Sequence, residues 1–429
     1  MKLIHKRETK KEKNFKMHNT SVKGKSSLLS SFNNQYTLTA LGLYINYFIH
    51  GMGVIILSQN MTYLMEQFNT DKAGVAYVIS ALGIGRFIVL YISGVLSDKF
   101  GRKPFVLGGI LTYIAFFIGI LISPNVQIAF IFGILAGMAN SFLDSGTIPA
   151  LIEAFPDAGS SANVFNKAFI SAGQFLLPMI ISFIVANDLW YGYSFIFCIV
   201  VLALNGIFLF MRPFPAINAD KKEIKEEVVV EEATGKGKPK FWIEGLSLII
   251  IGYTSTATFS IINTWIPSYG REVAGMAEAA SLKLVSYYSV GSIVAVVFTS
   301  IIVKSLVKPV RIVFIYPLIS TIMLTILWLN PTPMICIISA FVIGFAAAGG
   351  VLQLALTAMS DIFPSSKGKI TGMVYSASSI AGFTVPAITG AISNNVSNVI
   401  LFNIIVTGLG VLLALIVNIR YNSLQKARA

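Results

Sequence analysis

Two ionisable residues of opposite charge, Arg86 and Asp144, interrupt stretches of sequence that are otherwise apolar. In a helix that rises 1.5 Å per residue, Arg86 lies about 18 Å from Asp98, near which its apolar stretch ends. Asp144 lies about 14 Å from Glu153, at the same end of a neighbouring antiparallel stretch. The two charges therefore occupy similar depths, and we expect them to interact directly, through water or across a bound solute. A purely structural ion pair is the alternative.

A charged side chain inside a membrane is costly unless it is paired or hydrated, so each of these residues is a candidate for function. If Asp144 lines a cavity, burial favours its neutral form, and the carboxyl group could then carry a proton. Protonation of Asp144 would release Arg86 to bind an anionic solute. His50 is a second candidate for proton coupling, although a single histidine in a helix is more often a structural hydrogen-bonding group.

Neutral polar side chains could complete a solute site at the same depth. Asn46 and His50 are four residues apart and share one face of a helix, with Tyr47 close by. The remaining candidates are Asn140 and Gln174 in the first half of the chain and Asn263, Tyr288, Gln353 and Tyr375 in the second half. We expect the charged first half to set coupling and the neutral, aromatic second half to hold the solute.

The composition defines the kind of protein in which these residues act. Of the 429 residues, 55% are hydrophobic and only 12% are charged, whereas soluble proteins carry about 25% charged residues. This excludes an ordinary soluble enzyme. Apolar runs of span length predict twelve transmembrane helices, at 37–60, 73–96, 104–123, 126–153, 163–186, 189–211, 243–269, 281–303, 309–329, 333–361, 366–392 and 398–420.

These runs predict an all-α membrane protein with two pseudo-symmetric six-helix bundles. The expected order is a basic cytoplasmic tail, a first bundle, a charge-mixed cytoplasmic linker, a second bundle and a short tail, at 1–34, 35–211, 212–241, 242–420 and 421–429. By the positive-inside rule both termini are cytoplasmic. That placement leaves only four of the 32 Lys and Arg residues off the cytoplasmic side, namely Lys72, Arg86, Arg271 and Lys283.

An internal repeat supports two related halves. The run ALIEAFP at 150–156 matches AMSDIFP at 358–364, and the same offset of 208 residues pairs Pro178 with Pro386 and Gly83 with Gly291. Parallel repeats of this kind are typical of carriers that rock two halves about a central site. A pore or a receptor need not show them.

The segment GVLSDKFGRK at 94–103 resembles the loop signature of the major facilitator superfamily almost position for position. With twelve spans and a six-plus-six repeat, the resemblance covers about residues 36–420. Four further runs are similar to those of the YdiM/YdiN group of bacterial inner-membrane transporters: LGLY at 41–44, HGMGV at 50–54, LAGMANSFLDSGT at 135–147 and GQFLLP at 173–178. The resemblance implies a transporter, with solutes such as shikimate or quinate.

Two departures from family patterns argue against a multidrug antiporter. The fourth predicted helix has Asn140 and Asp144 where several proton-coupled branches carry an arginine. The fifth has Gly173 and Pro178 but not the adjacent Gly-Pro pair associated with antiporters.

The loop signature predicts a gate. Gly94 would let two helices approach closely, and Asp98 could accept hydrogen bonds from the N-terminus of the eleventh helix near Ser366. We call this contact the latch. Arg102 could reach Glu153. Gly101 and Lys103 complete the signature, and Asp361 is the repeat-related acid of the second half.

Several helix glycines, including Gly83, Gly85, Gly133 and Gly137, are interpreted as packing residues. The pair at 349–350 could loosen the tenth helix, but packing is the preferred interpretation there too. The cysteines Cys198 and Cys336 lie inside apolar runs without metal-ligand spacing, so we expect packing roles and neither metal nor cofactor.

The sequence thus favours a secondary active transporter, a monomer in the bacterial plasma membrane, that couples a small polar organic solute to protons. The solute could be a carboxylate of the shikimate or quinate type. An exporter of drugs or metabolites is the alternative within transport. An ATP-driven pump would need a GxxxxGK[ST] phosphate loop, which the sequence lacks. Nucleic-acid binding is not expected, because the positive charge lies in loops and tails rather than on a folded soluble face.

Overall fold

The computed structural model describes residues 34–156, 159–216, 240–305, 308–348, 350–363 and 367–428, and these ranges contain helices and no strand. The helices of the first half are α2 (Thr37–Gln59), α3 (Met61–Gln67), α4 (Lys72–Phe100), α5 (Arg102–Ile122), α6 (Val126–Ala154), α7 (Gly159–Ala186) and α8 (Tyr193–Phe210). The second half begins with the π-helical turn η1 (Phe241–Gly245) and α9 (Leu246–Glu272). It continues with α10 (Glu278–Leu282), α11 (Leu284–Ser305), α12 (Pro309–Leu329), α13 (Pro333–Ala348), α14 (Val351–Ile362), α15 (Lys367–Ala391) and α16 (Val396–Arg428).

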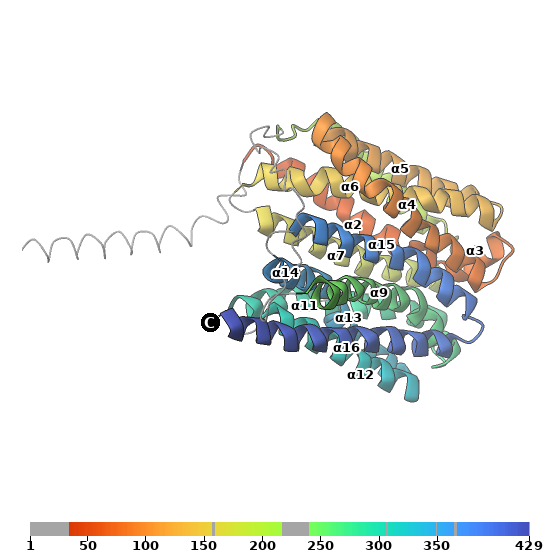
Figure 1. Cartoon of the computed structure of the whole chain (residues 1–429). Coiled ribbons are helices and arrows are strands. Elements are labelled where there is room, and N and C mark those ends of the chain that lie inside the picture. Colours follow the sequence, from red (N-terminus) through yellow and green to blue (C-terminus); the bar gives the residue numbers. More distant parts are fainter. Residues whose placement is uncertain are drawn as a thin grey trace, which may run out of the picture.

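Eleven helical segments of the described chain are long and apolar enough to cross a membrane. The predicted eleventh span, α15, is not among them, since its many Gly, Ser and Thr residues lower its mean hydropathy. It nevertheless packs along α4 and α9, side by side with the other long helices (Figure 1). The helix therefore occupies its expected place in the bundle although its composition is less apolar.

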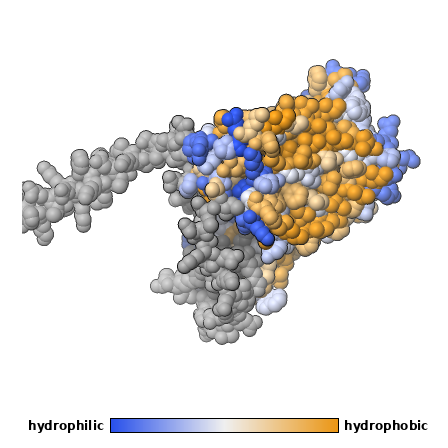
Figure 2. All heavy atoms as spheres, turned by 90° about the horizontal axis from the view of Figure 1, so that it is seen from above, coloured by the Kyte–Doolittle hydropathy of each residue, from blue (hydrophilic) through white to orange (hydrophobic). Residues whose placement is uncertain are grey.

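The outer surface is apolar over the middle of the molecule. Large hydrophobic side chains are exposed there, among them Tyr91 at 81%, Leu111 at 68% and Leu204 at 64%. Figure 2 shows an orange expanse on the face drawn, with blue polar residues gathered towards the ends. An apolar surface of this extent would not be stable in water, and an apolar middle between two polar ends is the pattern of a protein that spans a bilayer.

Local signals define several helix ends. Asp71 Oδ1 accepts a hydrogen bond from the Gly74 amide at 3.0 Å and caps α4, and Asn125 Oδ1 caps α6 by accepting from the Ile128 amide at 3.0 Å. Gly101 ends α4 with φ +97°, a conformation that side chains rarely adopt. The chain can therefore reverse sharply between α4 and α5.

Small residues let neighbouring helices touch through their backbones, as expected. A Cβ added at Gly137 of α6 would lie 2.0 Å from the Leu82 carbonyl oxygen of α4, and one at Gly85 of α4 would lie 2.0 Å from that of Ile134. The second half repeats the arrangement between α11 and α13. There an added Cβ at Gly291 would meet the Phe341 carbonyl oxygen at 2.1 Å.

The tenth predicted helix is not continuous, and the preference for packing at 349–350 was wrong. The helix divides into α13 and α14, and Gly350 between them adopts φ +97° in the left-handed region. This backbone conformation cannot continue an α-helix. Two short helices, α3 and α10, were not predicted from the apolar runs. They follow α2 and α9, at the corresponding point of each half.

Most of the hydrogen bonds found between the described residues of the two halves lie towards the end of the molecule that carries α3 and α10. Thr62 donates to Glu278 at 2.9 Å, and Arg271 donates to both, at 2.8 and 3.2 Å. Lys72 of α4 and Glu272 of α9 form an ion pair beside them. We call these five side chains the far-end cluster, because α3 lies opposite the C-terminus (Figure 1).

Candidate functional site

Arg86 on α4 and Asp144 on α6 form the contact that their depths predicted. Arg86 Nη2 lies 3.2 Å from Asp144 Oδ2, and the two side chains are 31% and 15% exposed. The pair is therefore partly exposed and not sealed in the core. The close crossing of α4 and α6 produces the contact, since an added Cβ at Gly137 would also lie 2.5 Å from the Arg86 amide nitrogen.

Tyr47 of α2 completes the environment of Asp144. Its hydroxyl group donates to Asp144 Oδ1 at 2.6 Å, so each carboxylate oxygen has one donor, a neutral hydroxyl on one side and a guanidinium on the other. The Arg86 Nε atom is buried without a partner among the described residues. The contacts of Arg86 within the protein therefore leave hydrogen-bonding capacity unused.

His50 and Asn46 face into the first half rather than towards Asp144. His50 Nδ1 lies 2.5 Å from the Tyr113 hydroxyl of α5, and Asn46 Oδ1 accepts from Asn205 Nδ2 of α8 at 2.7 Å. The His50 ring packs edge-on against Tyr47, with centroids 5.8 Å apart. These contacts correspond to the structural alternative that the sequence left open for the histidine.

The candidates of the second half are divided between two places. Tyr375 of α15 is half-buried and lies within Coulombic range of both Arg86 and Asp144. Gln353 is exposed on α14, just beyond the helix break. Tyr375 therefore interacts with the charged pair electrostatically, and neither side chain forms a hydrogen bond to the pair.

Asn263 and Tyr288 lie around a further aromatic residue, Phe259 of α9. Asn263 Nδ2 donates to the Phe259 carbonyl at 2.9 Å, and the Tyr288 ring of α11 lies 6.2 Å from the Phe259 ring. The Asn263 Oδ1 atom and the Tyr288 hydroxyl are buried and have no hydrogen-bond partner in the described chain. The two side chains lie close enough to interact with each other, so the Tyr288 hydroxyl can turn either to Asn263 or to a solute or water.

In the first half, Gln174 is fully buried whereas Asn140 is only half-buried. Gln174 of α7 is 2% exposed, and its Nε2 atom has no partner within the ranges that the structure covers. Asn140 is half-buried on α6, one turn before Asp144.

Lys167 of α7 was missed at the level of sequence. The predicted helix began at residue 163, which left this lysine in the first turn and among the cytoplasmic charges. The structure begins α7 at Gly159, so Lys167 lies more than two turns inside the helix, with Nζ 5.9 Å from the Phe259 ring centroid in the other half. Its spacing of seven residues from Gln174 puts both on one face, and that signal could have revealed it.

In the loop signature, Arg102 reaches Glu153 as predicted. Arg102 is 7% exposed, with Nη2 2.8 Å from Glu153 Oε1, and its Nη1 atom donates to Asp98 Oδ1 at 2.5 Å and to Ser97 Oγ at 3.1 Å. Lys103 donates to the Phe210 carbonyl at 2.7 Å, at the end of α8. The signature thus ties α4 and α5 to the ends of α6 and α8.

Other expectations for the gate differ or lie outside the described residues. Gly94 does not sit at a close helix contact, because an added Cβ would meet no described atom within 4 Å. Asp98 is 70% exposed and binds Arg102, while Ser366 on the other side of the latch is not described. The side chain of Asp361 is likewise outside the described set.

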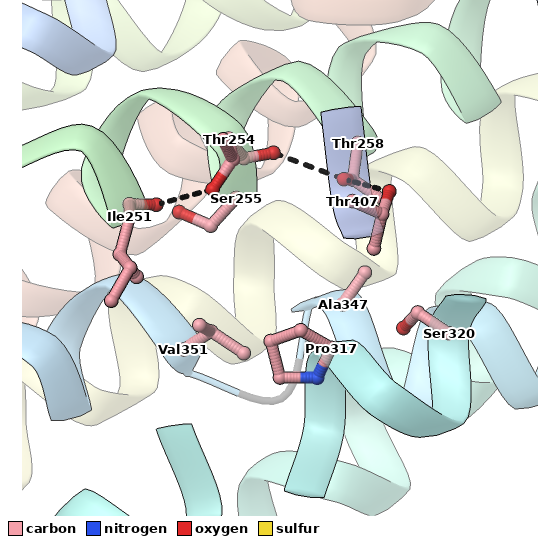
Figure 3. A pocket seen from close by; sticks show the side chains of 9 residues that line it. All are labelled: Ile251, Thr254, Ser255, Thr258, Pro317, Ser320, Ala347, Val351 and Thr407. Carbon is pink, nitrogen blue, oxygen red and sulfur yellow. Dashed lines mark hydrogen bonds between the residues drawn. The ribbon is translucent and has the colours of Figure 1, made fainter. Parts of the chain in front are cut away.

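A small pocket lies within the second half and not at the charged pair. Figure 3 shows its lining from α9, α12, α13, α14 and α16, beside the break of the tenth helix. Thr258 shares a hydrogen bond of 2.7 Å with Thr407, and the Ser320 hydroxyl is buried without a partner among the described residues. None of the predicted site residues lines this pocket.

Comparisons with known proteins identify the family. Residues 43–386 match the Major Facilitator Superfamily. The chain belongs to the major facilitator superfamily. It is 46% identical over 389 residues to "Inner membrane transport protein YdiM" of Escherichia coli (strain K12), covering 90% of this chain and 95% of that protein. It is 42% identical to "Uncharacterized MFS-type transporter YfkL" of Bacillus subtilis (strain 168), covering 91% of this chain and 98% of that protein.

Solved structures of this superfamily share the fold. The D-xylose-proton symporter superposes with a TM-score of 0.72 at 16% identity, covering 89% of this chain and 97% of that one. An inward-open xylose transporter XylE from E. coli gives a TM-score of 0.70 at 14% identity, covering 89% and 95%. The relatives are transporters, so this superfamily member is a transporter and not an enzyme. Transporters of this superfamily carry small-molecule solutes across a membrane.

Proposed function

We propose that this superfamily member is a proton-coupled secondary transporter that moves a small polar organic solute across the bacterial inner membrane by alternating access. The observation that carries the proposal is the arrangement around Asp144, a mostly buried carboxylate between the Tyr47 hydroxyl and the Arg86 guanidinium. A carboxylate inside a membrane must be paired, hydrated or protonated. Exchange among these states couples proton movement to a change of conformation.

The chemistry of the pair explains how coupling would work. While Asp144 is ionised, it attracts Arg86 and orders the Tyr47 hydroxyl as a donor. When Asp144 takes a proton, the attraction to Arg86 is lost and the α4–α6 contact carries an uncompensated cation. Tyr375 of α15 lies within range of both charges, so the other half of the protein would sense the change.

The placement of the ends is part of the proposal. The inner-membrane names of the relatives and the positive charge of the tails and linker support cytoplasmic termini. The far-end cluster would then lie on the periplasmic side and hold the two halves together there. The latch at Asp98 would form in the opposite conformation, when the cytoplasmic side closes.

Transport by reconstituted protein tests the proposal. The test solute is shikimate, which belongs to the solute class that the sequence suggests. Uptake is measured in proteoliposomes with an acidic external buffer and an alkaline internal buffer, and it is compared with counterflow at equal pH. Asp144→Asn should abolish accumulation driven by the pH gradient and retain some counterflow. Asp188→Asn, at an exposed carboxylate between α7 and α8, is the matched control.

The result has a clear contrary outcome. Accumulation by Asp144→Asn with the same dependence on the pH gradient as the wild-type protein would show that Asp144 is structural. His50 would then be the coupling residue to examine next.

A further inference from the structure

Lys167 is a cation at the boundary between the two halves. It lies on α7, and its ammonium nitrogen is 5.9 Å from the centre of the Phe259 ring on α9. Close backbone contacts set its depth, since an added Cβ at Gly51 of α2 would lie 2.1 Å from the Ile170 carbonyl oxygen of α7. Lys167 is therefore one turn from the level of His50 and lies within its Coulombic range.

The charges at this level do not balance within the described residues. Arg86 and Asp144 neutralise each other through their contact at 3.2 Å. Lys167 has no carboxylate within ion-pair distance among the residues that the structure describes. The Phe259 ring face is a weak substitute, because a cation–π contact offsets only part of the cost of burying a charge. One positive charge is thus left over at membrane depth, where it is costly.

Unused hydrogen-bonding groups surround the same boundary. Gln174 Nε2 lies two turns from Lys167 on one face of α7, and Asn263 Oδ1 lies one turn from Phe259 on α9. The Tyr288 hydroxyl belongs to the ring that packs against Phe259. Gln174 Nε2 has no partner among the described residues, while the Asn263 and Tyr288 side chains can interact with each other or with a ligand. Together with an unpaired cation and an aromatic face, these groups match a ligand that has a negative group and hydroxyl groups.

We propose that Lys167 binds the carboxylate of a monoanionic organic solute where α7 faces α9 and α11. The solute's ring or chain lies against Phe259, and its hydroxyl groups bind Gln174, Asn263 and Tyr288. Arg86 remains with Asp144 in the coupling pair. This assignment rests on the proposed function and differs from the expectation that Arg86 itself binds the anion.

A binding measurement on the purified, full-length protein tests the charge requirement. A ligand that binds only the folded state raises the melting temperature with concentration. The probes are shikimate, quinate and benzoate, each compared with its neutral methyl ester. The carboxylates should stabilise the wild-type protein and the esters should not.

Variants assign the effect to one side chain. Loss of a charge-assisted hydrogen bond weakens binding by about 10- to 100-fold, so Lys167→Gln should raise the Kd of the binding carboxylate by that factor. Lys167→Arg keeps the charge and should retain most of the affinity. Arg311→Gln, which removes an exposed cation at the start of α12, should leave the Kd unchanged.

The rate of thiol labelling tests the charge at the site without a ligand, and it remains informative if Lys167→Gln alters folding. In a background with Cys198→Ala and Cys336→Ala, Phe259→Cys provides a thiol at the proposed site. Anionic methanethiosulfonate should react faster than the cationic reagent, and Lys167→Gln should reverse or abolish that preference. The cationic reagent reacting faster in the presence of Lys167 would contradict the proposal.

Three results of the binding measurements would also overturn the inference. They are equal binding of esters and carboxylates, an unchanged Kd in Lys167→Gln, and no stabilisation by any carboxylate probe. Uptake of a neutral or cationic solute into proteoliposomes would refute the monoanion while the proposed transport function stands. Conversely, carboxylate binding without uptake or counterflow of any probe would refute the transport proposal and leave the site intact.

Discussion

Replacing Gly137 with alanine tests whether helix packing positions the charged pair. The added Cβ would lie 2.0 Å from the Leu82 carbonyl oxygen and 2.5 Å from the Arg86 amide nitrogen. Ordinary contacts begin near 3.4 Å, so α4 and α6 must separate locally by more than about 1 Å. Overpacking of a well-packed contact costs about 1–3 kcal/mol, and backbone atoms cannot rotate away as a side chain can.

The same displacement should reach the site. Arg86 and Asp144 are 3.2 Å apart in the structure, and a shift of about 1 Å moves them beyond the usual limit of 4 Å for an ion pair. We therefore expect Gly137→Ala to lower both the free energy of unfolding, by about 1–3 kcal/mol, and the accumulation of solute driven by a pH gradient. The assays are thermal unfolding of the purified protein and uptake by proteoliposomes.

Gly108→Ala is the matched control, because it adds the same methyl group inside the neighbouring helix α5. An added Cβ at Gly108 meets no described atom within 4 Å. Alanine is favoured over glycine in a helix by about 1 kcal/mol, so this variant should be neutral or slightly more stable. If Gly137→Ala were as stable and as active as Gly108→Ala, the close α4–α6 crossing would not determine the position of Arg86.

Two further predictions concern the ion pairs at the ends of the helices. Glu153→Gln leaves the buried Arg102 guanidinium without its main carboxylate and should lower the free energy of unfolding by about 3 kcal/mol, as measured by thermal unfolding, whereas Arg311→Gln at an exposed site should change it little. Glu272→Gln removes the partner of Lys72 in the far-end cluster and should favour separation of the halves there. An engineered cysteine on α3 should then react faster with a thiol reagent. Labelling at the wild-type rate would show that other contacts hold that end closed.

Much of the site follows from spacing along helices. The depths of Arg86 and Asp144, counted from the ends of their apolar runs, predicted a contact that the structure contains. The contact between Arg102 and Glu153 was predicted from the loop signature and the end of the fourth helix, and the structure contains it too. Helix rise is a fixed quantity, and antiparallel neighbours share their ends, so a sequence reports which residues lie at the same level.

The sequence could not predict how each helix is rotated about its axis, and therefore which of its faces points into the protein. A helix in a membrane is apolar both where it meets lipid and where it meets its neighbours, so its hydrophobic pattern does not distinguish the inner face. His50 therefore could not be assigned to Tyr113, nor Asn46 to Asn205, before the packing was known. Gly94 illustrates the opposite error, since a glycine in a family signature does not reveal whether a helix lies beside it.

The sequence by itself determined the class of protein, most of the membrane spans and the depths of Arg86 and Asp144, because composition and helix rise depend only on the order of residues. The tertiary structure decided the rest. It placed Lys167 against Phe259 of the other half, since the start of α7 depends on contacts that no apolar run records. It also divided the tenth helix at Gly350, because an apolar run is compatible with both a straight and a broken helix, and only packing against the neighbouring helices selects one.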